Sequence, residues 1–406
     1  MRILLLLVAF SAFGVEVATA ADQVPSRRHR ADPSAQHVRP GGGEPGDPLP
    51  GLTEEQLADF AAGKDEFLNV EDAEGGLGPI FNGSSCVSCH SAPATGGASD
   101  TLVTRFGLSD GELFDPLADL GGSLLQALAI DPLAQELVPD IADVVINRES
   151  TPLFGLGLVE AIPDNLIIAN ARRQKRHGIG GRVAMVEDLA NGGNRVGRFG
   201  WKAQLATLLD FSADAYVNEM GITSRIFPEE NAPNGNQELL AQFDAIMDPE
   251  DEIDAETGKG DIDHATDFMR FLAPPPRRPM GGSARAGERQ FERVGCADCH
   301  TPAFRTGSNP IAALHRKPVA LYSDLLLHDM GSLADGIAQG AAGPGEMKTA
   351  PLWGLRESGP YLHDGRAETV DAAIRGHEGE AARVRDGYAR LSDRDRQQLL
   401  EFLDTL

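Results

Sequence analysis

Two short motifs of the same form, Cys-x-x-Cys-His, stand in the two halves of the chain. Two thiols at this spacing can form thioether bonds to the two vinyl groups of one haem, and the adjacent histidine is then delivered to the iron as an axial ligand. A zinc site or a redox-active cysteine pair is the alternative chemistry. The histidine that follows both pairs favours haem, so the motifs predict two covalently attached haem c groups and no disulfide. The attachment residues are Cys86, Cys89, Cys296 and Cys299, and the proximal ligands are His90 and His300.

The sixth coordination position of each iron determines what that haem can do. A second protein ligand favours electron transfer, whereas an open position favours reaction with peroxide or oxygen. The function of each haem therefore depends on which residues of the sequence can occupy its sixth position.

The chain begins with features of a secretory signal peptide. Arg2 supplies a positive charge, an apolar stretch runs from Ile3 to Val15, and small residues at positions 18–20 form a cleavage site. Residues 1–20 are therefore predicted to be removed on export to the periplasm. No later stretch is predicted to span a membrane.

Chain length and net charge limit the number of domains and the class of binding partner. A length of 406 residues excludes a single small cytochrome and allows two or three domains. The formal net charge of -25 disfavours nucleic acid and anionic lipid as partners, and it favours a basic partner such as a small basic cytochrome.

The elements around the motifs indicate a repeat. Residues 21–50 are rich in Pro, Gly and charged residues and are predicted to form a disordered leader. A helix then opens at Thr53, with Gln56 in a capping box and Leu57, Phe60 and Phe67 on its apolar face. A helical Gly-x-x-x-Phe segment precedes each motif, at Gly63 and at Gly287, and a Pro-Leu-aromatic-Gly-Leu segment follows each. We therefore expect a mainly α fold of two cytochrome c-like haem domains related by an internal repeat, with much irregular chain and few strands.

The predicted domains are residues 51–180 for the N-terminal haem domain, 181–279 for a helical connecting region and linker, and 280–406 for the C-terminal haem domain. Residues 203–218 form the clearest amphipathic helical run of the connecting region. The acidic segment Asp248 to Asp263 lacks the spacing of an EF-hand loop, so it is interpreted as a solvated loop, with a Ca²⁺ site as the alternative.

Four segments carry a resemblance to a known family: Thr349 to Arg366, Thr151 to Pro163, Gly197 to Ala203, and His377 to Ala381. They resemble the bacterial di-haem cytochrome c peroxidase and MauG-like superfamily. Within it the chain is similar to the branch called di-haem oxidoreductases, or putative peroxidases, sometimes labelled thiol oxidoreductase-like. The resemblance covers most of residues 51–406. Thiol chemistry is rejected, because all four cysteines are expected to be bound to haem.

The resemblance implies a division of labour between the haems. The C-terminal haem would be a six-coordinate electron-transfer centre, and the N-terminal haem would handle peroxide. Classical members use a Met as sixth ligand of the C-terminal haem, where this chain has His377. A bis-histidine haem has a lower reduction potential than a His/Met haem. Met330 is the competing ligand, and a helix-end histidine is the non-ligand interpretation of His377.

Several other residues are candidates for roles near the haems. Glu160 could exchange protons with a peroxide at the N-terminal haem, although a surface Glu is the alternative. A Trp relays electrons between haems in the superfamily, and Trp353 is preferred here over Trp201. His177 is a possible sixth ligand or part of a basic turn. The candidate partners for haem propionates are Arg198, Lys202, Arg356 and Arg366.

The sequence therefore predicts a periplasmic di-haem c-type oxidoreductase that reduces hydrogen peroxide at the N-terminal haem, with electrons relayed by the C-terminal haem. The alternatives are a non-enzymatic electron-transfer or redox-sensing cytochrome, with a role in metal handling as one example, and MauG-like oxidation of a protein partner.

Overall fold

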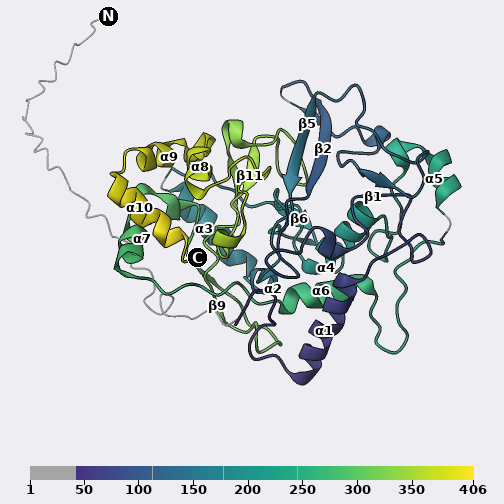
Figure 1. The fold of residues 1–406 in the computed structure, drawn as a ribbon, viewed down its shortest axis with the longest axis horizontal. Coiled ribbons are helices and arrows are strands. Elements are labelled where there is room, and N and C mark those ends of the chain that lie inside the picture. Colours follow the sequence, from purple (N-terminus) through teal and green to yellow (C-terminus); the bar gives the residue numbers. More distant parts are fainter. Residues whose placement is uncertain (1–42, 112, 177, 245) are drawn as a thin grey trace, which may run out of the picture. The chain divides into compact units, whose positions relative to one another are not determined.

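The computed structural model describes residues 43–111, 113–176, 178–244 and 246–406. The predicted signal peptide, most of the leader and His177 lie outside the described residues. Helices joined by long irregular segments dominate (Figure 1). The helices are α1 (Glu54–Leu68), α2 (Leu156–Glu160), α3 (Asp164–Lys175), α4 (Leu208–Ala215), α5 (Gln237–Phe243), α6 (Asp261–Phe271), α7 (Gly282–Val294), α8 (Val370–Arg375), α9 (Ala382–Ala389) and α10 (Asp393–Leu403). Among the described residues, no helix is long and apolar enough to span a membrane.

The strands are mostly short antiparallel pairs. They are β1 (Ile80–Phe81), β2 (Leu102–Ser109), β3 (Phe114–Asp115), β4 (Leu128–Ala129), β5 (Val144–Glu149), β6 (Met185–Glu187), β7 (Asn194–Val196), β8 (Phe304–Arg305), β9 (Pro318–Val319), β10 (Leu327–Asp329) and β11 (Glu346–Lys348). In the longest pair, Leu102 of β2 lies opposite Glu149 of β5. The prediction of few strands missed this pair. Its strands join segments far apart in the chain, which local alternation does not reveal.

Helix α1 starts where the capping box places it. The Thr53 hydroxyl accepts the Gln56 N–H, and the Gln56 side chain accepts the Thr53 N–H, so the predicted start is confirmed. Phe60 and Phe67 are buried against Phe268 of α6, with ring centroids 5.3 and 4.8 Å away. Leu57 is 41% exposed, so its predicted place on the apolar face is wrong.

Glycines let two helix pairs pack closely. In α1, a Cβ on Gly63 would lie 2.2 Å from the His264 carbonyl oxygen of α6. In α7, a Cβ on Gly287 would lie 1.8 Å from the Gln398 carbonyl oxygen of α10. A Cys-x-x-Cys-His motif follows each helix along the chain. In each helix, the Phe four residues after the glycine is buried. The two motifs thus share local features, and the internal repeat itself stays a prediction.

The connecting region is less helical than expected. The predicted run over residues 203–218 begins only at Leu208, because the Thr207 hydroxyl accepts the Asp210 N–H and caps α4 there. Ala203, at the start of the predicted run, has a positive φ of 52°. Strands β6 and β7 occupy part of the region before α4.

The prolines predicted to form a linker are packed into the structure. Pro274 and Pro275 are buried, and they approach Gly155 and Gly354 respectively. All described residues fall in one compact unit. The predicted boundaries at residues 180 and 279 therefore stay predictions.

The close approach at Gly287 yields a stability prediction. Gly287→Ala should lower the free energy of unfolding by about 1–3 kcal/mol, because the added methyl group meets backbone. Gly282→Ala on the same helix is the control, since a Cβ there meets nothing within 4 Å. Urea denaturation of both variants measures the difference. Equal stabilities would contradict the packing described for α7 and α10.

Candidate functional site

The second motif forms a turn directly after α7 that orients His300. Gly295, with a φ of 105°, ends α7, and residues 296–298 form a 3-10 turn. The Nδ1 atom of His300 lies 3.0 Å from the Tyr322 carbonyl oxygen. Burial, reinforced by the nearby His377, lowers the pKa of His300 to about 4. A neutral imidazole that donates Nδ1–H to a carbonyl leaves its Nε2 lone pair available to a metal.

His377 lies opposite His300. It follows α8, and its Nδ1 lies 2.8 Å from the Ala373 carbonyl oxygen, so its Nε2 is likewise available. The two ring centroids are 6.4 Å apart. Two imidazoles on one iron would have centroids roughly 6.3 Å apart, since each metal–nitrogen bond is about 2.0–2.1 Å and each ring adds about 1.1 Å. The side chains present therefore fit a bis-histidine haem. Met330 lines the same cavity, but it is the ring of His377 that faces His300.

A cavity of about 310 Å³ surrounds these two histidines. It extends from the second motif to the segment after β5, and its lining is mainly apolar, as expected for a site that buries a macrocycle. Its lining includes Ser150, Thr151, Phe291, Cys296, Cys299, His300, Trp353 and His377.

The first motif presents its histidine differently. The Nδ1 atom of His90 lies 3.0 Å from the Gly97 carbonyl oxygen, and the ring packs 6.2 Å from Phe67. Burial lowers the pKa of His90, against the effect of backbone hydrogen bonds to Gly97 and Thr151. Among the described residues, no second imidazole makes a ring contact with His90. The first site therefore has a histidine suited to the proximal position, and none of the described residues places an imidazole ring against it.

Glu149 is an acidic residue of the cavity that sequence reasoning missed. It ends β5, lines the cavity and is 8% exposed. Burial, with Asp364 and Asp100 adding repulsion, raises the pKa of Glu149 to about 7. Next to it, the Ser150 side chain hydrogen bonds to Cys89 of the first motif. A buried carboxyl with a pKa near neutrality can take and return protons. The sequence signal was weak, because Glu149 precedes rather than belongs to the quoted motif that starts at Thr151.

Glu160, the acid–base residue expected from the sequence, lies elsewhere. Its Oε2 accepts from Arg270 Nε at 2.9 Å, and its Oε1 accepts the Leu208 N–H at the start of α4 at 2.8 Å. It is not among the residues that line the cavity. A proton-transfer role would require Glu160 to break these contacts.

Both tryptophans line the cavity. A Cβ on Gly155, in the segment after the first motif, would lie 2.8 Å from the Trp353 ring, so Trp353 joins the corresponding segments of the two halves. Trp201 donates its Nε1–H to the Glu149 carbonyl at 2.9 Å and packs its edge on His363.

Most of the cations expected to bind propionates already have protein partners. Arg198 pairs with Asp164, Lys202 lies 2.8 Å from Asp335, and Arg366 pairs with Asp364. Arg356 donates to the Leu406 and Pro276 carbonyls. Of these four, Arg198 alone lines the cavity.

Lys348 is a cavity cation that the sequence did not indicate. Burial lowers its pKa to about 8, against the attraction of Asp324. No hydrogen bond or ion pair joins its ammonium to another described residue. The anionic groups of a haem would supply the missing partner, so Lys348 fits a propionate site better than the four expected cations.

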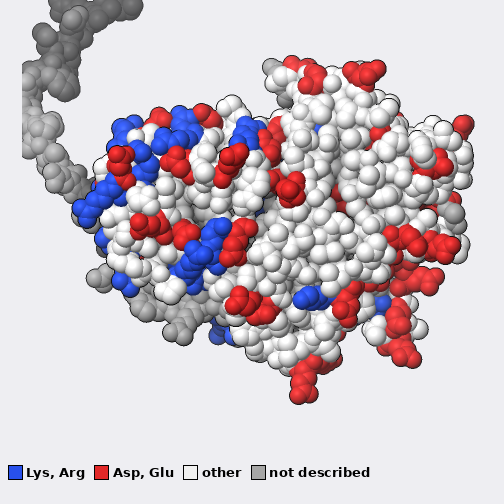
Figure 2. Space-filling view, viewed as in Figure 1, with Lys and Arg blue, Asp and Glu red and all other residues white. Residues whose placement is uncertain are grey.

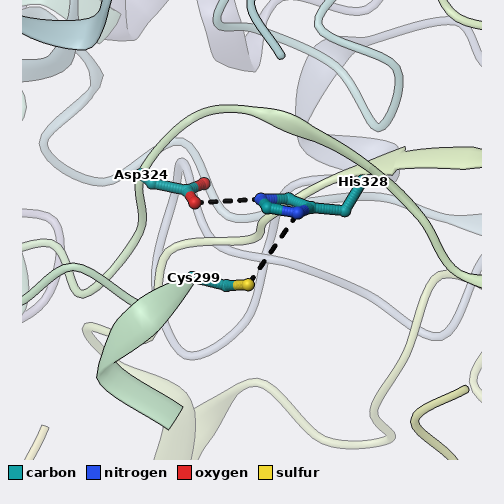
Figure 3. Close-up of side chains that lie close together, drawn as sticks. All are labelled: Cys299, Asp324 and His328. Carbon is teal, nitrogen blue, oxygen red and sulfur yellow. Dashed lines mark hydrogen bonds and ion pairs between the residues drawn. The ribbon is translucent and has the colours of Figure 1, made fainter. Parts of the chain in front are cut away.

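His328 belongs to a buried polar group beside Cys299 (Figure 3). Its Nε2 lies 2.9 Å from Asp324 Oδ2, and its Nδ1 lies 2.9 Å from Glu380 Oε2 and 3.8 Å from Cys299 Sγ. Burial opposes the charged form of His328, but hydrogen bonds to Asp324, Cys299 and Glu380 outweigh it and raise the pKa to about 12. Burial, against the lowering effect of His328, raises the pKa of the Cys299 thiol, which disfavours the thiolate that a zinc site in this group would need.

The acidic segment Asp248 to Asp263 contributes to a second group. Carboxylate oxygens of Glu230, Asp248 and Glu250 lie within 4.8 Å of one another. Burial, with repulsion from Glu250 and its acidic neighbours, raises the pKa of Glu230 to about 9. A protonated Glu230 accounts for this cluster without a cation, and the expected Ca²⁺ site stays a prediction.

The sequence profile described as "Di-haem oxidoreductase, putative peroxidase" matches residues 134–406. The chain belongs to this family. No functionally curated protein matches the chain significantly. The match covers the second motif and most of the residues that line the cavity, and the first motif lies outside it.

Three solved structures are similar to this di-haem oxidoreductase. One is a hydrazine synthase from Kuenenia stuttgartiensis, with 15% identity and a TM-score of 0.39, covering 98% of this chain and 100% of that chain. Another is a MauG-like protein associated with microbial copper homeostasis, with 17% identity and a TM-score of 0.40, covering 89% of this chain and 92% of that chain. The third is a variant of the diheme peroxidase BthA from Burkholderia thailandensis, with 13% identity and a TM-score of 0.38, covering 86% of this chain and 85% of that chain.

The Glu230 group yields a pH prediction. A carboxyl whose folded pKa lies near 9 instead of 4.5 binds its proton more tightly when folded, so stability is lost as pH rises between these values. Glu230→Gln should therefore raise stability at pH 8 by about 1–3 kcal/mol and have little effect at pH 4. Thermal unfolding with chelator present measures this, with the exposed Glu252→Gln as control. A variant equally or less stable at pH 8 would contradict the protonated cluster.

Proposed function

We propose that this di-haem oxidoreductase is an exported periplasmic c-type cytochrome that reduces hydrogen peroxide at the first motif, with electrons relayed through the second. The overall reaction consumes one peroxide, two electrons and two protons and yields two waters. When bound, the haems supply the electron transfer and the reduction of peroxide. Cys86, Cys89, Cys296 and Cys299 would attach them.

The observation that carries the proposal is the asymmetry of the two histidine sites. His300 faces His377 at a spacing that fits two ligands on one iron, whereas His90 faces no imidazole among the described residues. A site closed by two protein ligands suits electron transfer, and a site with one protein ligand leaves room for a small oxidant.

Glu149 is the proposed acid–base residue, in place of Glu160. A pKa near 7 lets its carboxylate accept one proton of peroxide and return it to the departing oxygen, without a strongly acidic or basic medium. The Trp201 N–H on the Glu149 carbonyl and the pairing of β5 with β2 position Glu149, and the adjacent Ser150 hydrogen bonds to Cys89 of the first motif. Lys348 would hold a propionate.

Trp353 is the proposed relay between the two motifs. It lines the cavity that begins at His300 and His377, and its ring contacts Gly155 in the segment that follows the first motif. An aromatic side chain in this position shortens the gaps that an electron must cross.

A small basic redox protein is the proposed electron donor. Asp and Glu gather at the lower right of the view, between the places of α1 and α5, whereas Lys and Arg mix with acids over α7 and α10 (Figure 2). The acidic face would attract a basic donor, and binding should weaken as salt screens it.

The spin states of the two haems test the proposal. The oxidised holoprotein should show one high-spin and one low-spin ferric haem by EPR, and His377→Ala should convert the low-spin haem to high spin. Met330→Leu is the control and should leave both signals unchanged. Two low-spin haems that do not react with peroxide would favour the electron-transfer or sensing alternative. A high-spin haem that oxidises a protein partner but does not turn over peroxide with a reduced cytochrome would favour MauG-like chemistry.

The role of Glu149 gives a separate kinetic test. Glu149→Gln should lower kcat/KM for peroxide by about 10²–10⁴-fold and remove the loss of activity expected as pH falls below about 7. Glu160→Gln is the matched control, and it should affect stability more than the pH profile. A pH inflection that survives in Glu149→Gln would show that another group handles the proton.

A further inference from the structure

The buried group around His328 is not needed to hold a haem, yet it lies against one of the attachment residues. His328 is 2% exposed, and Asp324 is fully buried. In Figure 3 the ring of His328 lies between Asp324 and Cys299, with a different ring nitrogen directed at each. A haem thioether at Cys299 would place the macrocycle next to this ring.

The hydrogen bonds hold His328 as an imidazolium. Nε2 faces the Asp324 carboxylate and Nδ1 faces the Glu380 carboxylate, each at 2.9 Å, so both ring nitrogens act as donors. Gln174 donates to the same Asp324 oxygen at 2.7 Å, and the Gly180 N–H donates to Glu380 at 3.1 Å. These contacts hold both carboxylates against the ring, Asp324 buried and Glu380 with its side chain 26% exposed.

Packing keeps the ring in place. A Cβ on Gly181 would lie 2.4 Å from His328 Cε1, so the backbone after α3 closes one side of the imidazole. The Nδ1 atom lies 3.8 Å from Cys299 Sγ. A fixed positive charge in a buried, weakly polarisable setting acts strongly on a neighbouring redox centre.

We propose that the His328 imidazolium raises the reduction potential of the haem attached at Cys299. This inference rests on the proposed function, because it requires a haem at the second motif. Ferrous haem carries one electron more than ferric haem, so a nearby cation favours the reduced form. Bis-histidine ligation and the Asp324 and Glu380 carboxylates lower the potential, and the imidazolium charge offsets part of that decrease. His328 is thus a positioning residue that acts on the haem through charge and does not ligate the iron.

Spectroelectrochemical titration of the holoprotein tests this directly. His328→Gln keeps a polar side chain but removes the charge, so the ferrous-to-ferric ratio of the low-spin haem at a fixed applied potential should fall at least tenfold, a shift of about 59 mV for one electron. Glu380→Gln removes a negative charge while Asp324 still pairs with His328, and it should shift the ratio in the opposite direction. Glu401→Gln on α10 is the control and should leave the ratio unchanged.

Opposite shifts in the two variants support the proposal, because a merely structural disturbance would not reverse sign with charge. A ratio within twofold of wild type in His328→Gln, or shifts of the same sign in both variants, overturns it. If His328→Gln does not assemble, His328→Asn, which also removes the charge and keeps an amide, replaces it in the same titration. A second haem found high spin contradicts the bis-histidine assignment, and the same titrations still decide the effect of His328.

Discussion

The hydrogen bond from an imidazole Nδ1–H to a backbone carbonyl is the interaction on which both centres depend. His90, His300 and His377 each make it, to Gly97, Tyr322 and Ala373 respectively. It satisfies one nitrogen inside an apolar site and turns the other toward the cavity, so burial favours the neutral ligand over the imidazolium. His328 shows the contrary case. Carboxylates on both nitrogens keep that ring charged and make it unsuitable as a ligand.

A second constraint is charge compensation inside the structure. Asp335 is buried. Its carboxylate accepts a hydrogen bond from Arg148 Nε at 2.9 Å and forms an ion pair with Lys202 Nζ at 2.8 Å. Arg148 lies in β5, so this buried group ties the strand that carries Glu149 to the segment that follows β10. Removing one of these three side chains would leave a buried charge unpaired. The resulting loss of stability exceeds the net stabilisation that the intact group provides. Cations used in this way are not free to bind haem propionates, which is why Lys348, with no such partner in the described part of the chain, is the better candidate.

The two halves share the packing around the proximal histidine and differ in the residues that face it. Each motif follows a helix in which a Gly permits close packing and a Phe is buried near the proximal histidine. The halves differ in what faces that histidine. Helix α8 and the turn after it bring His377 opposite His300, whereas the segment after β5 brings the Thr151 backbone to His90 and the Ser150 side chain to Cys89.

The sequence alone determined the chemistry that depends on covalent spacing: two Cys-x-x-Cys-His motifs, the capped start of α1, and the family. It also pointed to His377, because a motif position and a ligand type coincided there. It did not reveal the partners of Glu160, Arg198 and Lys202, which come from distant parts of the chain, or the exposure of Leu57. Burial and charged neighbours set the pKa values of three residues that the sequence did not single out. Asp364 acts on Glu149, and Asp324 acts on both Lys348 and His328. A pKa depends on desolvation and on nearby charges in space, and only the tertiary structure decides these.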